Sequence, residues 1–256
     1  MVLEGKIIFW STYSKEVYKV NIKVVSLDMA CTVFFEEGCY KGWEKSTLYR
    51  ATKRFHKKLV EYGFNIGFEE VYNTYLDLYK KQLSEDPWRE HGHLYRVYKV
   101  LKALGIKPTP KLTYELYKEY IEGVIEGFYL PREHRAFLED LKALNLVIVL
   151  STDTGSHEIP LKILERTNTL ELFDAIISSA LVGYTKASIE FYKHLLEIIG
   201  TSPEEIIHVG DNVTRDFKVP RRIGINSILF RFDGCKETDP KPCISKLSDL
   251  LNLLRQ

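Results

Sequence analysis

Four positions in this 256-residue chain carry side chains that phosphoryl chemistry requires. They are Asp28, Ser151, Lys186 and the carboxylate pair Asp211 and Asp216. Acidic side chains can hold Mg²⁺, while a lysine and a hydroxyl can neutralise phosphoryl oxygens in a transition state. Taken singly, each has an ordinary structural alternative: a helix cap, a solvated lysine or a turn. Together they favour a site that binds and attacks phosphorus.

Asp28 ends a short apolar run, and its position on that run makes it the leading candidate. Residues 24–27 are apolar, apart from Ser26, and are followed by a turn of small residues, which predicts a buried strand. In open α/β sheets ligands bind just outside the carboxyl ends of the strands. We therefore expect a nucleophile or a metal ligand at Asp28, with a simple capping role as the alternative.

The second half of the chain alternates between helical and strand-like segments after Pro131. The predicted strands are 146–150, 175–177, 206–209 and 227–230, and the predicted helices are 132–144, 159–166, 188–199, 214–223 and 247–254. Strands that alternate with helices of this length indicate parallel βαβ units. The expected fold class is α/β, with a Rossmann-like parallel sheet as its core.

Residues 36–128 have helical periodicity and no convincing strand. We expect a first helix containing Leu48 to Tyr62, followed by helices at 68–83, 88–104 and 112–128. If the strand at 24–28 belongs to the later sheet, this block is an all-helical cap over the sheet's functional edge. We assign 1–35 and 129–256 to the core and 36–128 to the cap. Two β-prone runs in the first 21 residues predict a hairpin.

Composition narrows the function further. The chain has 36 Lys and Arg residues against 35 Asp and Glu residues, so a surface that coats a polyanion is not expected and no nucleic-acid partner is predicted. The basic face of the first cap helix, which includes Arg50 and Lys53, is interpreted as solvated. No apolar run approaches the roughly 18 residues of a membrane span. A soluble cytoplasmic protein is expected.

The four cysteines form no CxxC pair, so a structural zinc site is not predicted and reduced thiols are expected. Gln and Met are scarce, whereas Lys, Glu and Tyr are plentiful, a bias typical of hyperthermophile proteins. Because intracellular disulfides occur in such organisms, a bridge between Cys235 and Cys243 stays open.

The four positions, in this order, resemble the motifs of the haloacid dehalogenase superfamily, which places them on a Rossmann-like sheet with a mobile cap. The resemblance covers about residues 22–232. It implies that Asp28 attacks phosphorus to form an aspartyl-phosphate, that Ser151 binds the phosphoryl group and that Lys186 steadies both. It also implies that Asp211 and Asp216 organise Mg²⁺. A Mg²⁺-dependent hydrolase of a small phosphorylated metabolite is the expected function.

One departure from the family pattern bears on mechanism. The family's phosphatases have a second Asp two residues after the nucleophile, where it protonates the leaving group, whereas this chain has Ala30. The Ala30 carbonyl can still ligate Mg²⁺, but a methyl group cannot move protons, and a general acid contributes roughly 10²- to 10⁴-fold. Cys31, where the family usually has Gly, is interpreted as a tolerated small residue rather than a reactive thiol.

Ala30 leaves several alternatives open. An Ala here resembles the phosphonoacetaldehyde hydrolase branch, which uses a cap lysine; Lys53, Lys57 and Lys58 are the candidates. A phosphatase of acyl or aryl phosphates would need less protonation, and a non-catalytic phosphate-binding protein would need none. Haloacid dehalogenation fits less well, because those enzymes carry an aromatic residue at this position. No residue type specifies the substrate or the oligomeric state.

Overall fold

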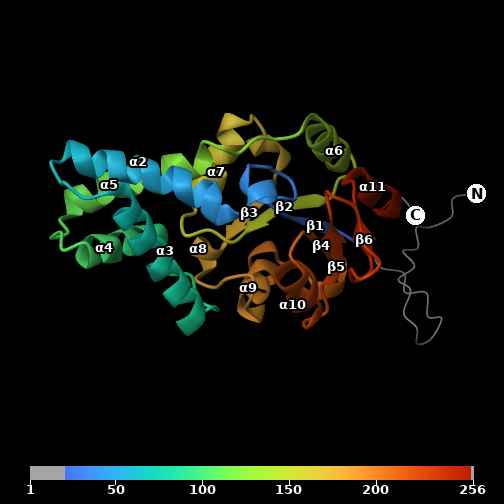
Figure 1. The fold of residues 1–256 in the computed structure, drawn as a ribbon. Coiled ribbons are helices and arrows are strands. Elements are labelled where there is room, and N and C mark those ends of the chain that lie inside the picture. Colours follow the sequence, from blue (N-terminus) through green and yellow to red (C-terminus); the bar gives the residue numbers. More distant parts are fainter. Residues whose placement is uncertain (1–20, 255–256) are drawn as a thin grey trace, which may run out of the picture.

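A computed structural model describes residues 21–254, and its centre is a six-stranded parallel sheet (Figure 1). The strand order is β3-β2-β1-β4-β5-β6. The strands are β1 (Val24–Asp28), β2 (Val147–Thr152), β3 (Ala175–Ser178), β4 (Ile206–Gly210), β5 (Asn226–Phe230) and β6 (Cys243–Ile244). This confirms the predicted α/β class. The hairpin predicted near the N-terminus lies almost wholly outside the described residues.

Strand β1 is central because both of its faces are buried. Val25 and Leu27 point into one apolar cluster and Val24 into the other, as the two-residue period of a strand requires. The same parity places Ser26 and Asp28 on the face of Val24. Polar side chains therefore sit inside the sheet layer, directly below the carboxyl end where the site forms.

Helices cover both faces of the sheet, as parallel sheets require. One face packs against α6 (Arg132–Lys142), α7 (Glu158–Arg166) and α11 (Ser248–Leu254), and the other against α9 (Ile189–Ile199) and α10 (Val219–Arg221) (Figure 1). The short helix α8 (Ser179–Val182) directly follows β3. Among residues 21–254, no helix combines the length and the apolar character that a membrane crossing needs.

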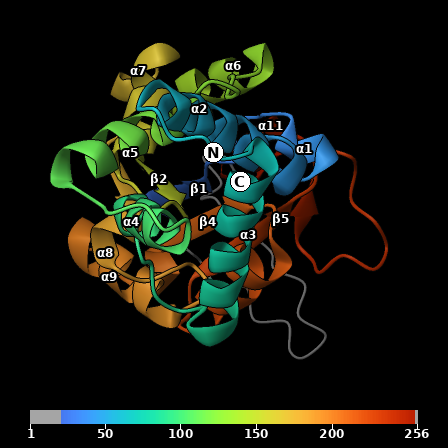
Figure 2. The same ribbon diagram turned by 60° about the vertical axis from the view of Figure 1, so that its left-hand side comes forward.

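A group of helices lies between β1 and β2 in the chain. They are α1 (Gly38–Lys41), α2 (Thr47–Glu61), α3 (Phe68–Glu85), α4 (His93–Ala103) and α5 (Pro110–Ile125), with a short 3₁₀ turn at Trp43–Lys45. Helices α2 to α5 lie together at one end of the molecule, and Figure 2 shows them in front of the strand ends. We call them the cap. The boundary at 36–128 remains a prediction.

The two chain segments that join the cap to the core lie side by side. The Phe35 N–H donates to the Tyr129 carbonyl at 2.9 Å, and the Tyr129 N–H donates to the Phe35 carbonyl at 2.9 Å. This pair of bonds forms a short antiparallel bridge. The two linker segments between the core and the cap are thus hydrogen-bonded to each other.

Helix α4 begins at His93, not at residue 88 as its periodicity predicts. Residues 87–92 instead cross to the core, where the Thr185 N–H donates to the Trp88 carbonyl at 2.9 Å and the Glu90 N–H donates to the Gly183 carbonyl at 3.1 Å. These backbone groups have partners in the core, so they do not need helical ones. Gly92, with φ +69°, turns the chain into the helix.

The segment predicted as one helix over 214–223 is also different. It is a π-helix at Val213–Lys218, which continues into the three-residue helix α10. Single π-turns occur frequently at functional sites. Here the wider turn carries Asp216, whose N–H donates to the Asn212 carbonyl at 2.9 Å.

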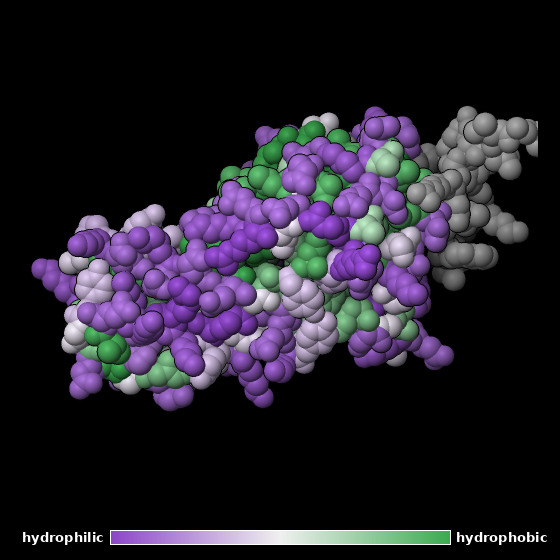
Figure 3. Space-filling model, turned by 90° about the horizontal axis from the view of Figure 1, so that it is seen from above, coloured by the Kyte–Doolittle hydropathy of each residue, from purple (hydrophilic) through white to green (hydrophobic). Residues whose placement is uncertain are grey.

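Two of the basic residues of α2, Arg50 and Arg54, have acidic partners within the molecule. Arg54 pairs with Glu119 at 2.9 Å and with Glu126 at 3.2 Å, and Arg50 pairs with Glu36 at 3.2 Å. The face shown in Figure 3 is mainly hydrophilic over the cap, with hydrophobic residues gathered nearer the core. Lys53 and Lys57 on the same helix, α2, are exposed to solvent.

Helices α2 and α5 approach closely at Gly123, where an added Cβ would lie 2.6 Å from the Ala51 Cα. We therefore predict that Gly123→Val lowers the free energy of unfolding by about 1–3 kcal/mol, because the helices must separate to admit the side chain. Urea unfolding followed by circular dichroism measures this. Gly67→Ala is the control, since an added Cβ there meets nothing within 4 Å. Equal stability of both variants would contradict the close packing.

Candidate active site

A cavity of about 400 Å³ lies between the carboxyl ends of the strands and the cap. Its core side includes Asp28, Ala30, Lys186, Asp211 and Asp216, so five of the six predicted site residues line one space. Ser151 is the exception. Ligand pockets of about 300–1,000 Å³ are usual for small molecules, so the cavity suits a small ligand.

Lys186 is the charged centre of this cavity, and its side chain is only 2% exposed. Its Nζ lies 2.5 Å from Asp28 Oδ1 and 2.5 Å from Asp216 Oδ1. A buried ammonium without partners would be strongly unfavourable. These contacts raise the pKa of Lys186 despite its burial, so it stays charged.

Three carboxylates meet beside this lysine. Asp28, Asp211 and Asp216 each offer an oxygen, and these oxygens all lie within 4.8 Å of one another. Burial raises the pKa of Asp28 to about 8, with Lys186 opposing the shift and the other two acids adding to it. Burial, then repulsion by Asp216, raises the pKa of Asp211 to about 6. The cluster therefore holds more negative charge than one lysine neutralises.

Asp216 is the member of the cluster that stays ionised. Burial opposes its charge, but Lys186 and a hydrogen bond from His208 hold its pKa well below the usual range. Its Oδ2 also accepts from the Asn212 N–H at 2.9 Å. Asp216 therefore forms a permanent ion pair with Lys186. Asp211 is the acid of this cluster that has no ion-pair partner among residues 21–254.

The donor set fits a hard divalent cation. Carboxylate and carbonyl oxygens are the ligands that Mg²⁺ prefers. Within residues 21–254 the Asp211 carboxylate accepts no hydrogen bond from another side chain, and the Ala30 carbonyl accepts none from the backbone. Both groups line the cavity and keep lone pairs for a ligand.

Ser151, predicted to contact the phosphoryl group, points elsewhere. It pairs with Asp28 in the β1–β2 register, but its side chain is fully buried and its Oγ lies 3.0 Å from Ser26 Oγ, below the cavity. The next residue, Thr152, lines the cavity instead. Neighbouring side chains of a strand point to opposite faces, so Thr152 does not share the buried contact that holds Ser151.

A buried polar layer supports the acids from below, and the sequence analysis missed it. The two nitrogens of His208 face Ser26 Oγ at 3.0 Å and Asp216 Oδ1 at 3.1 Å. Burial lowers the pKa of His208, so it is neutral and, because ionised Asp216 only accepts, donates its proton there. Polar residues inside otherwise apolar strands, Ser26 and His208, were the available signal.

Asp153 is another residue that supports the site and was not predicted from the sequence. One of its carboxylate oxygens accepts from the Lys186 N–H at 2.7 Å, and the other accepts from Arg215 Nη1 at 3.0 Å. It lines the cavity, but both oxygens are engaged. Its evident role is to fix the backbone that presents the Lys186 ammonium.

The structure corrects the expectation of reduced thiols, because Cys31 is bonded to Cys39 and Cys235 to Cys243. Cys31 follows Ala30 directly and lines the cavity. Its φ of 60° lies in the left-handed region, which explains why glycine suits this position. It is therefore neither a reactive thiol nor a mere small residue: it joins the loop of Asp28 to helix α1.

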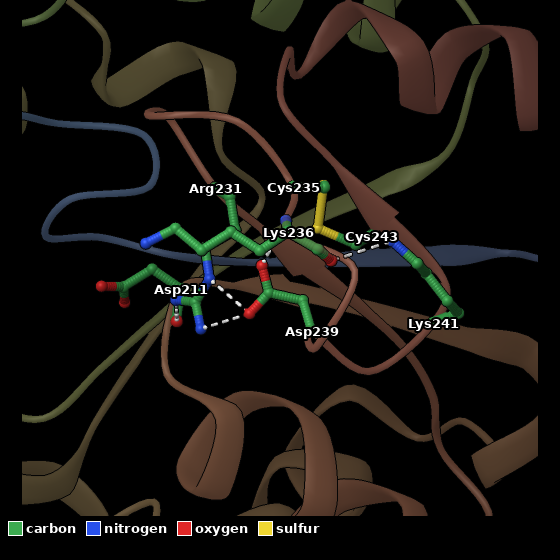
Figure 4. Close-up of a disulfide and its surroundings, with 7 residues drawn as sticks. All are labelled: Asp211, Arg231, Cys235, Lys236, Asp239, Lys241 and Cys243. Carbon is green, nitrogen blue, oxygen red and sulfur yellow. Dashed lines mark hydrogen bonds and ion pairs between the residues drawn. A yellow bond between two sulfur atoms is a disulfide. The ribbon is translucent and has the colours of Figure 1, made fainter.

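The second disulfide closes a loop that reaches the acid cluster (Figure 4). Within that loop Asp239 accepts from Arg231 Nε and Nη2 at 3.2 Å each. Arg231 Nη1 in turn donates to the Asp211 carbonyl at 2.5 Å. A continuous set of contacts thus runs from the Cys235–Cys243 loop to the backbone of a candidate metal ligand.

Known proteins resemble this chain over most of its length. Residues 22–224 match the family model of the haloacid dehalogenase-like hydrolases. The chain is 28% identical over 204 residues to a glyceraldehyde 3-phosphate phosphatase of Methanocaldococcus jannaschii, covering 78% of this chain and 86% of that protein. It is 26% identical over 199 residues to a glyceraldehyde 3-phosphate phosphatase of Pyrococcus furiosus, covering 74% and 75%.

Solved structures share the fold. A 2-haloacid dehalogenase from Pseudomonas syringae pv. Tomato superposes with a TM-score of 0.69 at 18% identity, covering 91% of this chain and 98% of that one. A HAD phosphatase from Thermococcus onnurineus gives a TM-score of 0.60 at 19% identity, with coverage of 91% and 98%. At these identities the likeness concerns the fold alone.

The two disulfides offer a matched pair, because each joins cysteines separated by eight positions. Loops of this size predict that Cys235→Ser/Cys243→Ser and Cys31→Ser/Cys39→Ser each lose about 2–3 kcal/mol of unfolding free energy. Urea unfolding with and without reductant measures it. Reductant should lower the unfolding free energy of the wild type by the sum of the two losses. An unfolding free energy of the wild type that does not change with reductant would contradict both disulfides.

Proposed function

We propose that this chain, which belongs to the haloacid dehalogenase-like hydrolases, is a Mg²⁺-dependent phosphatase of a small phosphorylated metabolite. One observation carries the proposal: Lys186 lies between Asp28 and Asp216, and Asp211 completes a cluster of acids at the floor of a small cavity. The glyceraldehyde 3-phosphate phosphatases among its relatives support a three-carbon phosphate as the first substrate to test.

In the proposed reaction the Asp28 carboxylate attacks phosphorus and the ester oxygen leaves, which gives an aspartyl-phosphate that water then hydrolyses. Lys186 orients Asp28 and neutralises the phosphoryl oxygens. Thr152, which lines the cavity, takes the hydroxyl role that the sequence suggested for Ser151. When bound at Asp28, Asp211, Asp216 and the Ala30 carbonyl, Mg²⁺ supplies further charge neutralisation.

The leaving oxygen needs a proton, and Ala30 has none to give. Asp153, another acid in the cavity, has both oxygens engaged by Lys186 and Arg215. We therefore propose water in the cavity as the source of the proton. This favours substrates whose leaving groups need little protonation, such as acyl and aryl phosphates, and slower turnover of alkyl phosphates.

The phosphonatase-like alternative requires a cap lysine inside the cavity. Among the described residues that line it, Lys186 of the core is the one lysine. Lys53 and Lys57 are exposed on α2, and Lys58 pairs with Glu61 at 3.0 Å. We therefore prefer phosphate-ester hydrolysis. A non-catalytic phosphate-binding protein remains the competing proposal. Hydrolysis by the wild type, compared with Asp28→Asn and Ala30→Asp, distinguishes it from a phosphatase.

Mg²⁺ binding should release protons. Without metal the pKa of Asp28 is about 8, so near pH 7 this carboxyl is mostly protonated and must ionise to bind a cation. We expect release of about one proton at pH 7 and an affinity that rises roughly tenfold per pH unit between pH 6 and 8. Calorimetric titration with Mg²⁺ in two buffers of different ionisation enthalpy measures this. An affinity independent of pH would contradict the acid cluster as the metal site.

Two substitutions test the chemistry. Asp28→Asn should abolish Mg²⁺-dependent hydrolysis of phenyl phosphate, because it removes the nucleophile. Ala30→Asp should raise hydrolysis of an alkyl phosphate by about 10²-fold or more, because it restores a general acid in the cavity. Steady-state phosphate release measures both, and Ala143→Asp, on the exposed end of α6, is the control. Turnover that appears only in Ala30→Asp would favour the non-catalytic protein.

A further inference from the structure

The cap side of the cavity combines apolar and aromatic side chains with polar ones. Trp43, Leu83, Val124 and Phe128 represent the apolar part. Thr47 and His93 also line the cavity. Thr47 Oγ1 is buried and has no hydrogen-bond partner among residues 21–254. The side-chain contacts of His93 within the same residues are made by its Nδ1, which leaves Nε2 open. Both residues belong to the cap side of the cavity, where the group esterified to phosphate would lie.

Thr47 is the first residue of α2, and only 3% of it is exposed. Its Oγ1 is one of two fully buried side-chain polar atoms that lack a partner in the described part of the chain. A buried hydroxyl without a hydrogen bond is unfavourable, typically by more than the bond would contribute when made. The position is explained if a ligand supplies the missing partner.

His93 is fixed as a hydrogen-bond donor. Its Nδ1 lies 2.9 Å from Arg96 Nη1 and 3.3 Å from the Tyr75 hydroxyl. Arginine has no lone pair, so Nδ1 must accept, and the proton of the neutral ring is on Nε2. Burial and Arg96 lower the pKa of His93 well below its ordinary value, which agrees with a neutral ring.

The surroundings hold the ring in place. It packs against the Tyr120 ring with centroids 5.0 Å apart, and the His93 N–H donates to the Gly155 carbonyl at 2.7 Å. An added Cβ on Gly155 would lie 2.9 Å from His93 Cγ, so core and cap are in direct contact here. The Nε2–H of His93 is thus a donor at a fixed place on the cavity wall.

The cations of the described cavity wall are already engaged. Lys186 is held by two acids and Arg215 by Asp153, while Arg96 donates to Gln82 Oε1 at 2.8 Å and lies 3.6 Å from Glu90. Glu36 and Glu90 add negative charge near the cap. A carboxylate or a second phosphate on the substrate would therefore find no cation on this wall that lacks a partner.

We infer that the Thr47 hydroxyl and His93 Nε2–H form a specificity subsite for an uncharged oxygen of the leaving group. It would take a hydroxyl or carbonyl of a short polyol or hydroxy-aldehyde phosphate and reject a carboxylate in the same place. The inference rests on the proposed function, since it assigns the phosphate to the Lys186 end of the cavity. Neither residue touches the reacting atoms, so both are specificity residues.

Binding in the Asp28→Asn background tests the subsite without turnover. The ligands are glyceraldehyde 3-phosphate, 3-phosphoglycerate, which replaces the aldehyde with a carboxylate, and phenyl phosphate, which has no distal oxygen. With Mg²⁺ present, calorimetry should show the aldehyde binding at least about tenfold more tightly than the acid. Thr47→Val and His93→Phe should each weaken binding of the aldehyde by about 3- to 10-fold more than that of phenyl phosphate.

Conservative variants separate recognition from packing. Thr47→Ser keeps the hydroxyl and His93→Gln keeps a donor, so both should retain the preference for the aldehyde within about twofold. Thr52→Val is the matched control, because it removes a hydroxyl of the same helix that bonds to the Leu48 carbonyl and does not line the cavity. Thermal unfolding of each variant checks that it folds.

The outcomes distinguish the two proposals. Selective binding without hydrolysis by the wild type would retain the subsite and overturn the phosphatase. Hydrolysis with an aldehyde-to-phenyl ratio unchanged in both Thr47→Val and His93→Phe would retain the phosphatase and overturn the subsite. Tight binding of 3-phosphoglycerate would also overturn the subsite, since it would show that the cap accepts a carboxylate.

Discussion

The buried ammonium of Lys186 between Asp28 and Asp216 is the constraint on which the rest of this structure depends. A charge removed from water must be paired and hydrogen-bonded, so the loop that carries it has to meet the ends of two strands at fixed positions. Asp153 fixes the lysine backbone, and His208 fixes Asp216 from below. The central sheet order, with β1 beside β4, brings these partners together.

Much of this arrangement was predictable from sequence. Apolar runs that end in Asp28 and in Gly210-Asp211 identify neighbouring strand ends, because parallel strands deliver their carboxyl ends to one edge. Thr152 rather than Ser151 lines the cavity, because Ser151 Oγ is held in the buried layer beside Ser26 Oγ, a contact that the sequence does not reveal. The predicted start of α4 at residue 88 was wrong, because the residues before His93 form hydrogen bonds with residues 183–185, which lie almost a hundred positions away in the sequence. The disulfides depend on Cα separations of 5.4 and 6.1 Å, which spacing alone does not specify.

The site is better equipped to hold charge than to move protons. Apart from Asp211, its main acids have partners: Asp28 and Asp216 pair with Lys186, Asp153 with Lys186 and Arg215, and Glu36 with Arg50. The neutral tautomer of His93 is likewise fixed as a donor rather than poised to exchange a proton. Ala30 is therefore consistent with its surroundings, and selectivity would arise from the shape and polarity of the cavity more than from acid catalysis.

The paired linkers at Phe35 and Tyr129 have a mechanical consequence. Two separate linkers would let the cap twist or slide against the core. Two linkers that are hydrogen-bonded to each other would act as a single hinge and permit mainly a rotation about it. The loop closed by the Cys31–Cys39 disulfide contains one side of that hinge, and it begins directly after Ala30. Any rotation of the cap helices about this bridge would therefore also act on the loop that carries Asp28.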